Sequence, residues 1–235
     1  MATLTGQTIA SSYEQLLHVD TDGGGNTTTL VPVKDGDNGT TFAMQLSTTT
    51  VCIDNPTADS STQGGILRLQ SDDGALMQSG SRLGVIEFAG AEDSSSTITV
   101  GGRIESVTDA AWSASENGAD MVFYTTDGNA SQSEVMRLTA DNLVGIGTTA
   151  PTGGRLLTLK EQASQSAAIQ FMDTDSSLMG TIGLNRTGSD IVSGSSANSM
   201  IIYNQYSGGV LQLASDGAVR LTIDSNSRIS LSNND

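Results

Sequence analysis

The sequence predicts an all-β protein made of short strands that repeat along the chain, and three observations favour this fold class. Among 235 residues there are 27 Gly but only 3 Pro, and aromatic residues make up 4%, so turns are many and large side chains are few. Runs of strand length recur at a distance of about 80 residues. Asp-Gly, Asn-Gly and Asp-Asn pairs, which form hairpin turns readily, separate these runs. A chain of this kind stacks its repeats or borrows core surface from identical partners.

The residues at 1–54 differ in pattern from the rest and form an N-terminal segment. Ser11 and Glu14 have the spacing of a helix capping box, and Tyr13, Leu16 and Leu17 would share one face of a helix of one or two turns. A helix this short is marginal alone, so we expect it to dock on another surface. The segment either attaches the protein to a partner or simply carries a docked helix.

A duplication divides the remainder into a first β-unit at 55–150 and a second β-unit at 151–235. Arg137 in VMRLTAD and Arg220 in AVRLTID are 83 positions apart (220 − 137), and Ile86-Glu87-Phe88 returns as Ile169-Gln170-Phe171 at the same spacing. The order of the segments is kept, and loops absorb small differences in spacing.

A proline marks the start of each unit. Val51-Cys52-Ile53 precedes Pro56, and Val144-Gly145-Ile146 precedes Pro151. The fixed φ and missing N–H of proline after a short strand indicate a boundary. Ile229-Ser230-Leu231 resembles the start of a third junction of this kind.

The expected strands are short and partly alternating. Those of the first unit span 65–71, 83–89, 97–107, 121–126 and 134–139. Those of the second unit span 156–160, 167–172, 180–186, 200–204, 210–214 and 219–223. The segment 120–124 and its counterpart 199–203, 79 positions later (199 − 120), carry apolar side chains on both strand faces. Both faces therefore need to be covered, and a partner chain can supply that cover.

Charge and composition argue against several classes of function. Ten basic against 26 acidic residues give a net charge of -16, whereas a nucleic-acid binder needs clustered positive charge. The single Cys52 excludes an intrachain disulfide and is read as a small buried hydrophobe. The N-terminus is no signal peptide, and no apolar run reaches the roughly 20 residues of a membrane span. We therefore expect a soluble protein without membrane insertion, made in a cytoplasm.

The sequence gives no sign of a catalytic, cofactor or metal site. His18 is the sole histidine, so histidine metal sites and serine triads fail, and it is read as a satisfied structural residue. The acidic turns at Asp20-Thr21-Asp22 and Asp35-Gly36-Asp37 lack the glutamate that completes a calcium loop, so turn chemistry explains them better. The remaining acids are read as solvated strand edges and loops rather than a glycosidase pair: Glu87, Asp93, Glu105, Asp109, Glu116 and Asp120. We expect no enzyme.

The sole tryptophan, Trp112, lies in an expected loop. Exposed aromatic rings stack on sugars, so a glycan contact through Trp112, together with Tyr206, is one interpretation. Packing under a loop or at an axis between copies is the other.

The stretch Arg137–Pro151 (RLTADNLVGIGTTAP) resembles the RI-x-x-x-G-x-VGIGT-x-x-P motif of phage tail-fibre and virion structural proteins. The segments 101–105 and 119–126 resemble what usually precedes that motif. The segment 4–49 is similar to the start of structural proteins of marine tailed phages. Asn142 stands where the family more often has Gly, a mild change at a turn.

The resemblance implies an elongated homotrimeric β-rich fibre or spike of repeated small β-units that takes part in host attachment. Its partners would be two further copies of itself, other virion proteins through the N-terminal segment, and a host surface glycan. It implies a virion protein assembled in the host cytoplasm. Many such fibres end in an auto-cleaving chaperone domain, for which this chain has no room, so trimerisation is expected to be intrinsic.

Two alternatives stay open at this point. A head fibre or capsid decoration protein would have the same fold. A monomeric carbohydrate-binding module would instead close its own core and bind sugar through Trp112.

Overall fold

The computed structural model describes residues 16–20, 27–36, 39–57, 61–128, 131–152, 154–162, 166–174, 178–187, 191–226 and 228–231. The chain forms two compact units whose bounds differ from those of the expected β-units. We call Met1–Leu69 the first unit and Gln70–Asp235 the second unit. Every regular element in the described residues is a β-strand, so the predicted all-β class is confirmed. These ranges contain no helix with the length and hydrophobicity that a membrane crossing needs.

The first unit holds one antiparallel sheet of four strands in chain order, which we call the first sheet. Its strands are β1 (Leu17–Val19), β2 (Val31–Asp35), β3 (Thr41–Leu46) and β4 (Val51–Ile53). Val31 and Val33 of β2 are 6% and 5% exposed and form its small core. A bulge between Pro32 and Lys34 lets β2 accommodate a proline, which has no N–H for the ladder.

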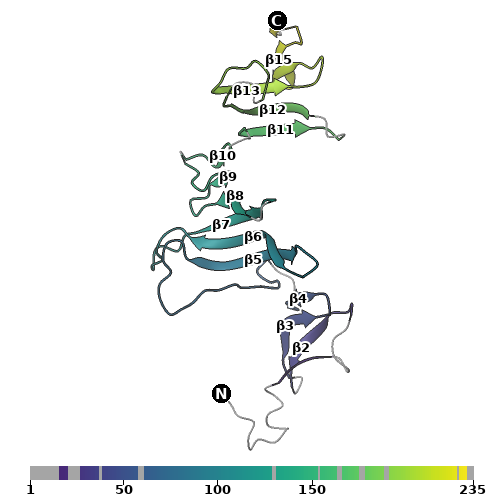
Figure 1. Cartoon of the computed structure of the whole chain (residues 1–235), viewed down its shortest axis with the longest axis vertical. Coiled ribbons are helices and arrows are strands. Elements are labelled where there is room, and N and C mark those ends of the chain that lie inside the picture. Colours follow the sequence, from purple (N-terminus) through teal and green to yellow (C-terminus); the bar gives the residue numbers. More distant parts are fainter. Residues whose placement is uncertain are drawn as a thin grey trace, which may run out of the picture. The chain divides into compact units, whose positions relative to one another are not determined.

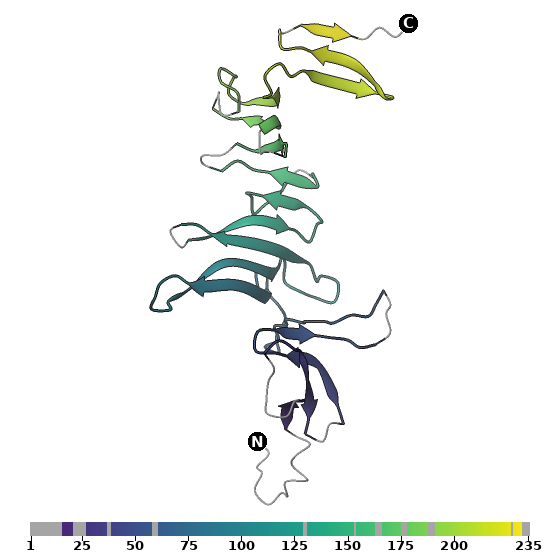
Figure 2. The same ribbon diagram turned by 90° about the vertical axis from the view of Figure 1, so that its right-hand side faces the viewer.

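The second unit holds three sheets (Figure 1). The second sheet contains β5 (Arg82–Ala91), β6 (Ile98–Thr108), β7 (Ala119–Thr126), β8 (Gln132–Leu138), β9 (Val144–Ile146) and β10 (Leu157–Leu159). The third sheet contains β11 (Ala168–Met172), β12 (Leu178–Asn185) and β13 (Ser199–Asn204). The fourth contains β14 (Leu211–Ser215), β15 (Ala218–Ile223) and β16 (Ile229–Leu231), seen side by side in yellow in Figure 2.

Polar side chains close most of the turns between neighbouring strands. Asp35, Asp127 and Asp224 each begin a turn, and the carboxylate of each accepts the N–H of the residue that ends it, at 2.9 to 3.2 Å. Ser47 and Thr139 do the same with their hydroxyls. These contacts explain why Ser, Thr and Asp are so frequent between the strands.

The tightest turn is the two-residue hairpin between β14 and β15. Asp216 and Gly217 have φ angles of 50° and 70°, the positive values that a type I′ turn requires at both central positions. The Asp-Gly pair was expected to form such a turn, and this prediction is confirmed.

The three junctions predicted from the sequence each begin with the same kind of short strand. β4, β9 and β16 are each three residues long and pair antiparallel with the strand before them.

The hydrogen bonds that flank β9 determine which of its backbone groups point away from β8. Thr139 N–H donates to Leu143 O (2.9 Å) and Gly147 N–H donates to Val135 O (3.0 Å), so alternation turns the amides of Val144 and Ile146 toward the outer edge.

The VGIGT motif returns the chain along that outer edge. β10 pairs parallel with β9, the one parallel pair among the described strands. Val144 N–H donates to Leu156 O (2.7 Å), and Lys160 N–H donates to Ile146 O (2.9 Å). Gly147 has a φ of 72°, and a Cβ there would lie 2.6 Å from Lys160 O. Only glycine fits a left-handed residue that another backbone approaches so closely.

Most expected strands are present, one is absent, and the expected helix lies mainly outside the described residues. The strand predicted at 65–71 belongs to no sheet, because the chain does not run back along β4 as β10 does along β9. The helix predicted around Tyr13 is not confirmed: residues 1–15 lie outside the described part, and Leu17 begins β1. The division at 54 and 150 stays a prediction.

Candidate interaction surface

A row of apolar side chains crosses the whole second sheet. The directly paired residues in this row are, from β5 to β10, Ile86, Ile104, Phe123, Met136, Ile146 and Leu159. Residues paired across strands lie on the same face of a sheet. None of the six is buried, and Ile86 and Ile146 are 45% and 43% exposed.

The third and fourth sheets repeat this pattern. Ile169, Ile182 and Ile202 form one row across β11, β12 and β13. Leu213, Leu221 and Leu231 form a row across β14, β15 and β16, and Leu211, Ile223 and Ile229 form the row beside it. The row on the other face of the fourth sheet is Gln212, Thr222 and Ser230. We call the rows of hydrophobic residues the apolar rows.

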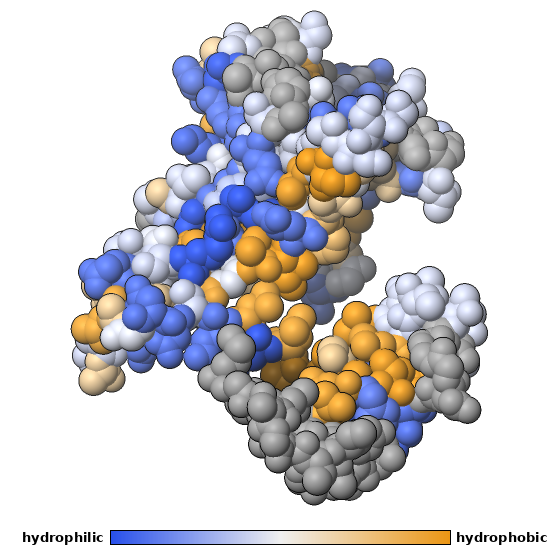
Figure 3. Space-filling model, turned by 60° about the horizontal axis from the view of Figure 1, so that its bottom comes forward, coloured by the Kyte–Doolittle hydropathy of each residue, from blue (hydrophilic) through white to orange (hydrophobic). Residues whose placement is uncertain are grey.

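The apolar rows are open to solvent in the single chain. Among the described residues, only Val31, Val33 and Val122 are buried hydrophobic residues. Large hydrophobic side chains lie exposed on every sheet, and Figure 3 shows several of their clusters (orange) at the surface. Apolar surface of this extent is unfavourable in water, and exposed apolar patches are typical of interaction sites.

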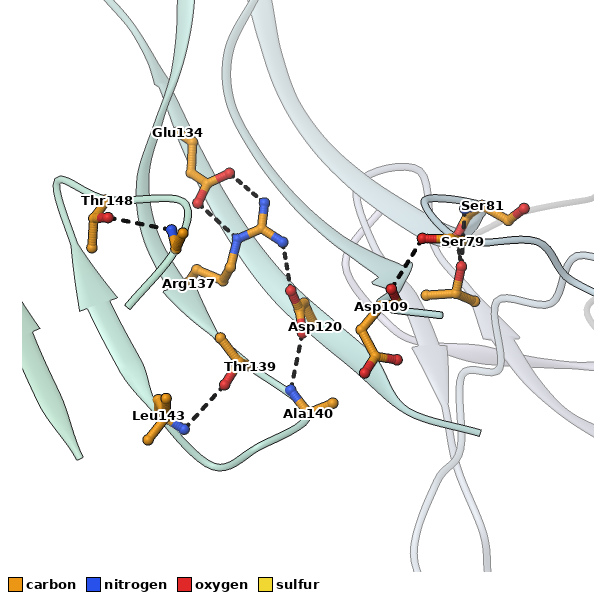
Figure 4. A network of polar contacts seen from close by, with 12 residues as sticks. Ser79, Ser81, Asp109, Asp120, Glu134, Arg137, Thr139, Ala140, Leu143 and Thr148 are labelled. Atoms are coloured by element: carbon orange, nitrogen blue, oxygen red, sulfur yellow. Dashed lines mark hydrogen bonds and ion pairs between the residues drawn. The ribbon is translucent and has the colours of Figure 1, made fainter. Parts of the chain in front are cut away.

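The opposite face of the second sheet carries an ion-pair network instead (Figure 4). Arg137 of β8 donates from Nε and Nη2 to the two carboxylate oxygens of Glu134, at 2.9 and 2.6 Å. Its Nη1 donates to Asp120 Oδ2 of β7 at 2.6 Å, and Asp120 Oδ1 accepts Ala140 N–H at 2.9 Å. The pKa of Arg137 is raised, first by the hydrogen bonds to Glu134 and then, against desolvation, by Asp120.

A second charged group lies on the same face. Glu105 of β6 is 5% exposed and forms ion pairs with Arg82 (2.8 Å) and Arg103 (3.3 Å). The guanidinium of Arg103 lies 4.1 Å from the ring centroid of Tyr124, a cation–π distance. Burial raises the pKa of the Tyr124 hydroxyl, and Glu105 adds to this effect.

These contacts correct the expectation that Glu105 and Asp120 are solvated. Asp120 is 9% exposed, and each of the two carboxylates forms an ion pair with an arginine of a neighbouring strand. Val122 of β7 is paired with Glu105 of β6 on one side and with Arg137 of β8 on the other, and it is fully buried. The long charged side chains thus cover one face of the sheet, whereas the face with the apolar row is uncovered in the single chain.

The two residues considered for a glycan contact belong to loops of different sheets. Trp112 follows β6 and is half-buried; its indole N–H donates to Gly118 O and its backbone N–H to Met77 O, both at 2.9 Å. Tyr206 follows β13 and is 62% exposed. The Trp112 contacts hold its loop together, as a packing role requires, and a glycan contact stays a prediction.

The other residues singled out in the sequence occupy simple structural positions. Asp35 closes a turn by accepting Thr40 N–H at 2.9 Å, as turn chemistry predicts, and Asp20 pairs with Lys34 at 2.7 Å. His18 of β1 is half-buried, and its Nδ1 has no hydrogen-bond partner in the described structure, so the expected satisfied histidine is wrong for this atom. Cys52 is half-buried rather than buried. In the described ranges, no group of three or more His, Cys, Asp or Glu side chains is placed to hold a metal ion.

The sequence predicted the strands of the second unit but not that their apolar rows form a surface. The usable signal was the alternation in pairs such as Ile86 and Phe88 or Ile169 and Phe171, which predicts one apolar face. The sequence did not reveal that the charged face is the more buried one, because this depends on ion pairs between residues of different strands.

Comparison with known proteins finds similar solved structures, two of which are described here. Both are of the carboxy-terminal domain of the L-shaped tail fibre of bacteriophage T5, the second with its intramolecular chaperone domain. Each has a TM-score of 0.33 and covers 76% of this chain, at 9% and 10% identity. The matched regions span 90% of the first of those chains and 62% of the second. No family model matches the chain, and no curated protein matches it. A likeness with this TM-score assigns no role to any residue.

Proposed function

We propose that this chain is a structural virion protein of a tailed phage, a tail-fibre or spike subunit that assembles as a homotrimer and takes part in host attachment. The observation that carries the proposal is the set of apolar rows, which lie open on all three sheets of the second unit. Covering them needs a partner with a matching series of apolar stripes. A further copy of the same chain has such a series by construction.

The apolar face of the second sheet narrows at β6, and this favours three copies over two. Two sheets stacked face to face, about 10 Å apart, use apolar side chains over the whole face. In the second sheet, Ile104 stands between Gly102 and Ser106 on the same face of β6, so the stripe there is one residue wide. A narrow stripe suits copies that meet around a common axis, and the charged face would then lie outside.

The native mass tests this assembly directly. Light scattering on a sizing column should give three times the 24.2 kDa of one chain. A mass of two chains would replace the trimer with a dimer. The mass of a single chain would overturn the proposal in favour of a monomeric carbohydrate-binding module, and a glycan screen with Trp112→Ala as the binding-loss control would follow.

The place of the protein on the particle needs a separate experiment. We propose that residues 1–54 attach the subunit to other virion proteins and that residues 55–235 project from the particle. Deleting residues 2–50 should abolish incorporation into particles while the remaining sheets stay folded by circular dichroism. Unchanged incorporation would contradict this role. Gold-labelled antibody on intact particles distinguishes a tail position from a head-fibre or capsid-decoration position.

A further inference from the structure

One segment of the first unit is extended and exposed without a place in any sheet. Ile66, Leu67 and Leu69 are 72%, 67% and 44% exposed. In the described structure, no hydrogen bond or ion pair involves residues 66–69. An extended apolar segment with open backbone groups is ready to add to another strand.

The same sequence element forms a strand at the next junction. Gly64-Gly65-Ile66-Leu67-Arg68-Leu69 has its counterpart in Gly153-Gly154-Arg155-Leu156-Leu157-Thr158-Leu159, which is one residue longer and likewise ends in Leu-x-Leu. There, the final Leu-x-Leu is β10, which pairs parallel with β9 so that Leu157 lies beside Val144 and Leu159 beside Ile146. By this correspondence Leu67 and Leu69 belong beside Val51 and Ile53 of β4.

The outer edge of β4 has the same hydrogen-bonding pattern as that of β9. Ser47 N–H donates to Thr50 O at 2.9 Å, and Asp54 N–H donates to Ala43 O at 2.7 Å. Alternation along the antiparallel pair then turns the amides of Val51 and Ile53 away from β3. In β9 the equivalent groups bond to β10. β4 is the edge strand of its sheet, with no described strand on its outer side, and Val51 is 64% exposed.

The segment does not reach this edge within its own chain. Asn55 Nδ2 donates to Gln63 Oε1 (3.1 Å) and to Gly64 O (3.3 Å), which holds the returning chain at the end of β4. Gly65 lies so close to the Ile53 carbonyl that a Cβ would overlap it. The residue that reaches Ile53 is therefore Gly65, four positions before Leu69 (69 − 65), and the Leu-x-Leu element does not pair with β4.

We propose that Leu67–Leu69 adds as a parallel strand to β4 of a second copy of this chain, an inference that rests on the proposed homotrimer. Around three copies the exchange closes, since each chain gives one strand and receives one. In the first sheet Val51 is paired with Leu46 and Ile53 with Met44, and Leu67 and Leu69 would extend these two apolar pairs. Because Gly65 of the receiving chain lies against its own Ile53 carbonyl, the added strand bonds at Val51 and at the Ile53 N–H.

Cysteine cross-linking tests the exchange, with a matched pair inside the same molecule as control. Both variants carry Cys52→Ser, so that no other thiol takes part. Val51→Cys with Leu67→Cys places thiols on the proposed pair. Val144→Cys with Leu157→Cys places them on the equivalent pair within one chain. Paired strand residues lie within the Cα distance of about 4.4–6.8 Å that a disulfide spans.

The native mass is measured first, and each protein is then oxidised and run on a denaturing gel without reductant. We expect the first variant to shift to the mass of three linked chains, and the control to stay at the 24.2 kDa of one chain with its thiols lost. A native trimer in which the first variant bonds only within one chain, or stays unbonded while the control bonds, overturns the exchange but leaves the homotrimer standing. A native monomer overturns the proposed function itself.

Mixed assemblies remove any ambiguity about which chain supplies which thiol. Chains with Val51→Cys alone and chains with a mass tag and Leu67→Cys alone are refolded together. The exchange requires a bonded species containing both chains. Its absence from mixed trimers contradicts the exchange.

Discussion

Asp120 joins two strands and a turn through its two carboxylate oxygens. One oxygen accepts from Arg137 and the other from Ala140 N–H, so β7, β8 and the turn after β8 meet at one nearly buried charge. A carboxylate in this position is stable only while its partners hold the charge.

Arg137→Ala should therefore lower the free energy of unfolding by about 3–5 kcal/mol, because it leaves two nearly buried carboxylates without their cation. Arg228→Ala is the matched control, since Arg228 is 73% exposed and pairs with Asp224 at the surface. Its loss should change the free energy by at most about 1 kcal/mol. Denaturant titration at a fixed chain concentration measures both, and equal effects would show that the Arg137 network is no more important than a surface pair.

Gly147→Ala tests the turn of the VGIGT motif. An alanine there meets both an unfavourable positive φ and Lys160 O at 2.6 Å, so we expect a loss of about 2–4 kcal/mol. Gly154→Ala isolates the first effect, since Gly154 has a φ of 63° and open space around its Cβ position. Its cost should be about 1–2 kcal/mol. If thermal unfolding gives the two variants the same loss, the close approach of the Lys160 backbone is unimportant.

At the scale of the strand, alternation decides which face is apolar. In β11, Ile169 and Phe171 lie on the face of the apolar row, and Gln170 points to the other side, opposite Thr181. Because the period of a strand is two, a shift of one residue in the pairing would reverse the faces and expose the polar side chains to the partner.

Phe171→Ser should weaken assembly. Phe171 is 53% exposed in the single chain, so its loss would matter little to a monomer. If other copies cover Phe171 in the assembly, its replacement would remove about 1.5–3 kcal/mol of favourable burial from each chain. Gln170→Ser, on the opposite face of the same strand, should leave the mass unchanged. Native mass over a dilution series compares them, and equal dissociation of the two variants would exclude this face from the interface.

The strands of the second unit could be predicted from sequence because each carries its own pattern. Apolar and polar residues alternate in Ile86-Glu87-Phe88, and the pair Asp216-Gly217 predicts a type I′ turn. The segment 65–71 has the same pattern but forms no strand in the single chain, since pairing also needs an open edge within reach. In the first sheet only β4 was expected. β2 includes a proline and β1 is three residues long, so neither gives a strong strand signal.

The ion-pair face could not be predicted from sequence. Arg137 pairs with Asp120, 17 positions away, and Arg82 with Glu105, 23 positions away (105 − 82). These pairs depend on the register between strands, which the residue pattern of one strand does not specify. Acidic residues in strands therefore looked solvated when each was considered alone.

At the scale of the whole molecule, net charge opposes association. Each chain carries -16, so three copies bring together -48 (3 × 16). Repulsion between exposed charges is screened over about 10 Å at 0.1 M salt, whereas apolar burial is not weakened by it.

Raising NaCl from about 10 to about 150 mM should therefore lower the concentration at which the assembly dissociates. Analytical ultracentrifugation measures this concentration. Sodium sulfate at the same ionic strength serves as the control, because sulfate also strengthens apolar burial and should act more strongly. Dissociation that becomes easier with salt would indicate that ion pairs between copies, rather than the apolar rows, hold the assembly.

The meander topology has a consequence for how the protein folds. Within each sheet, every strand pairs with its neighbour in the sequence, so the hydrogen bonds of the single chain close short loops and form early. In the proposed homotrimer, however, the apolar rows gain their cover only when chains meet. Refolding should then separate into a fast phase independent of concentration and a slow phase that accelerates as the protein is concentrated. During synthesis, chains emerging from neighbouring ribosomes on one messenger would meet at high local concentration, and this would shorten the time for which their apolar rows are exposed.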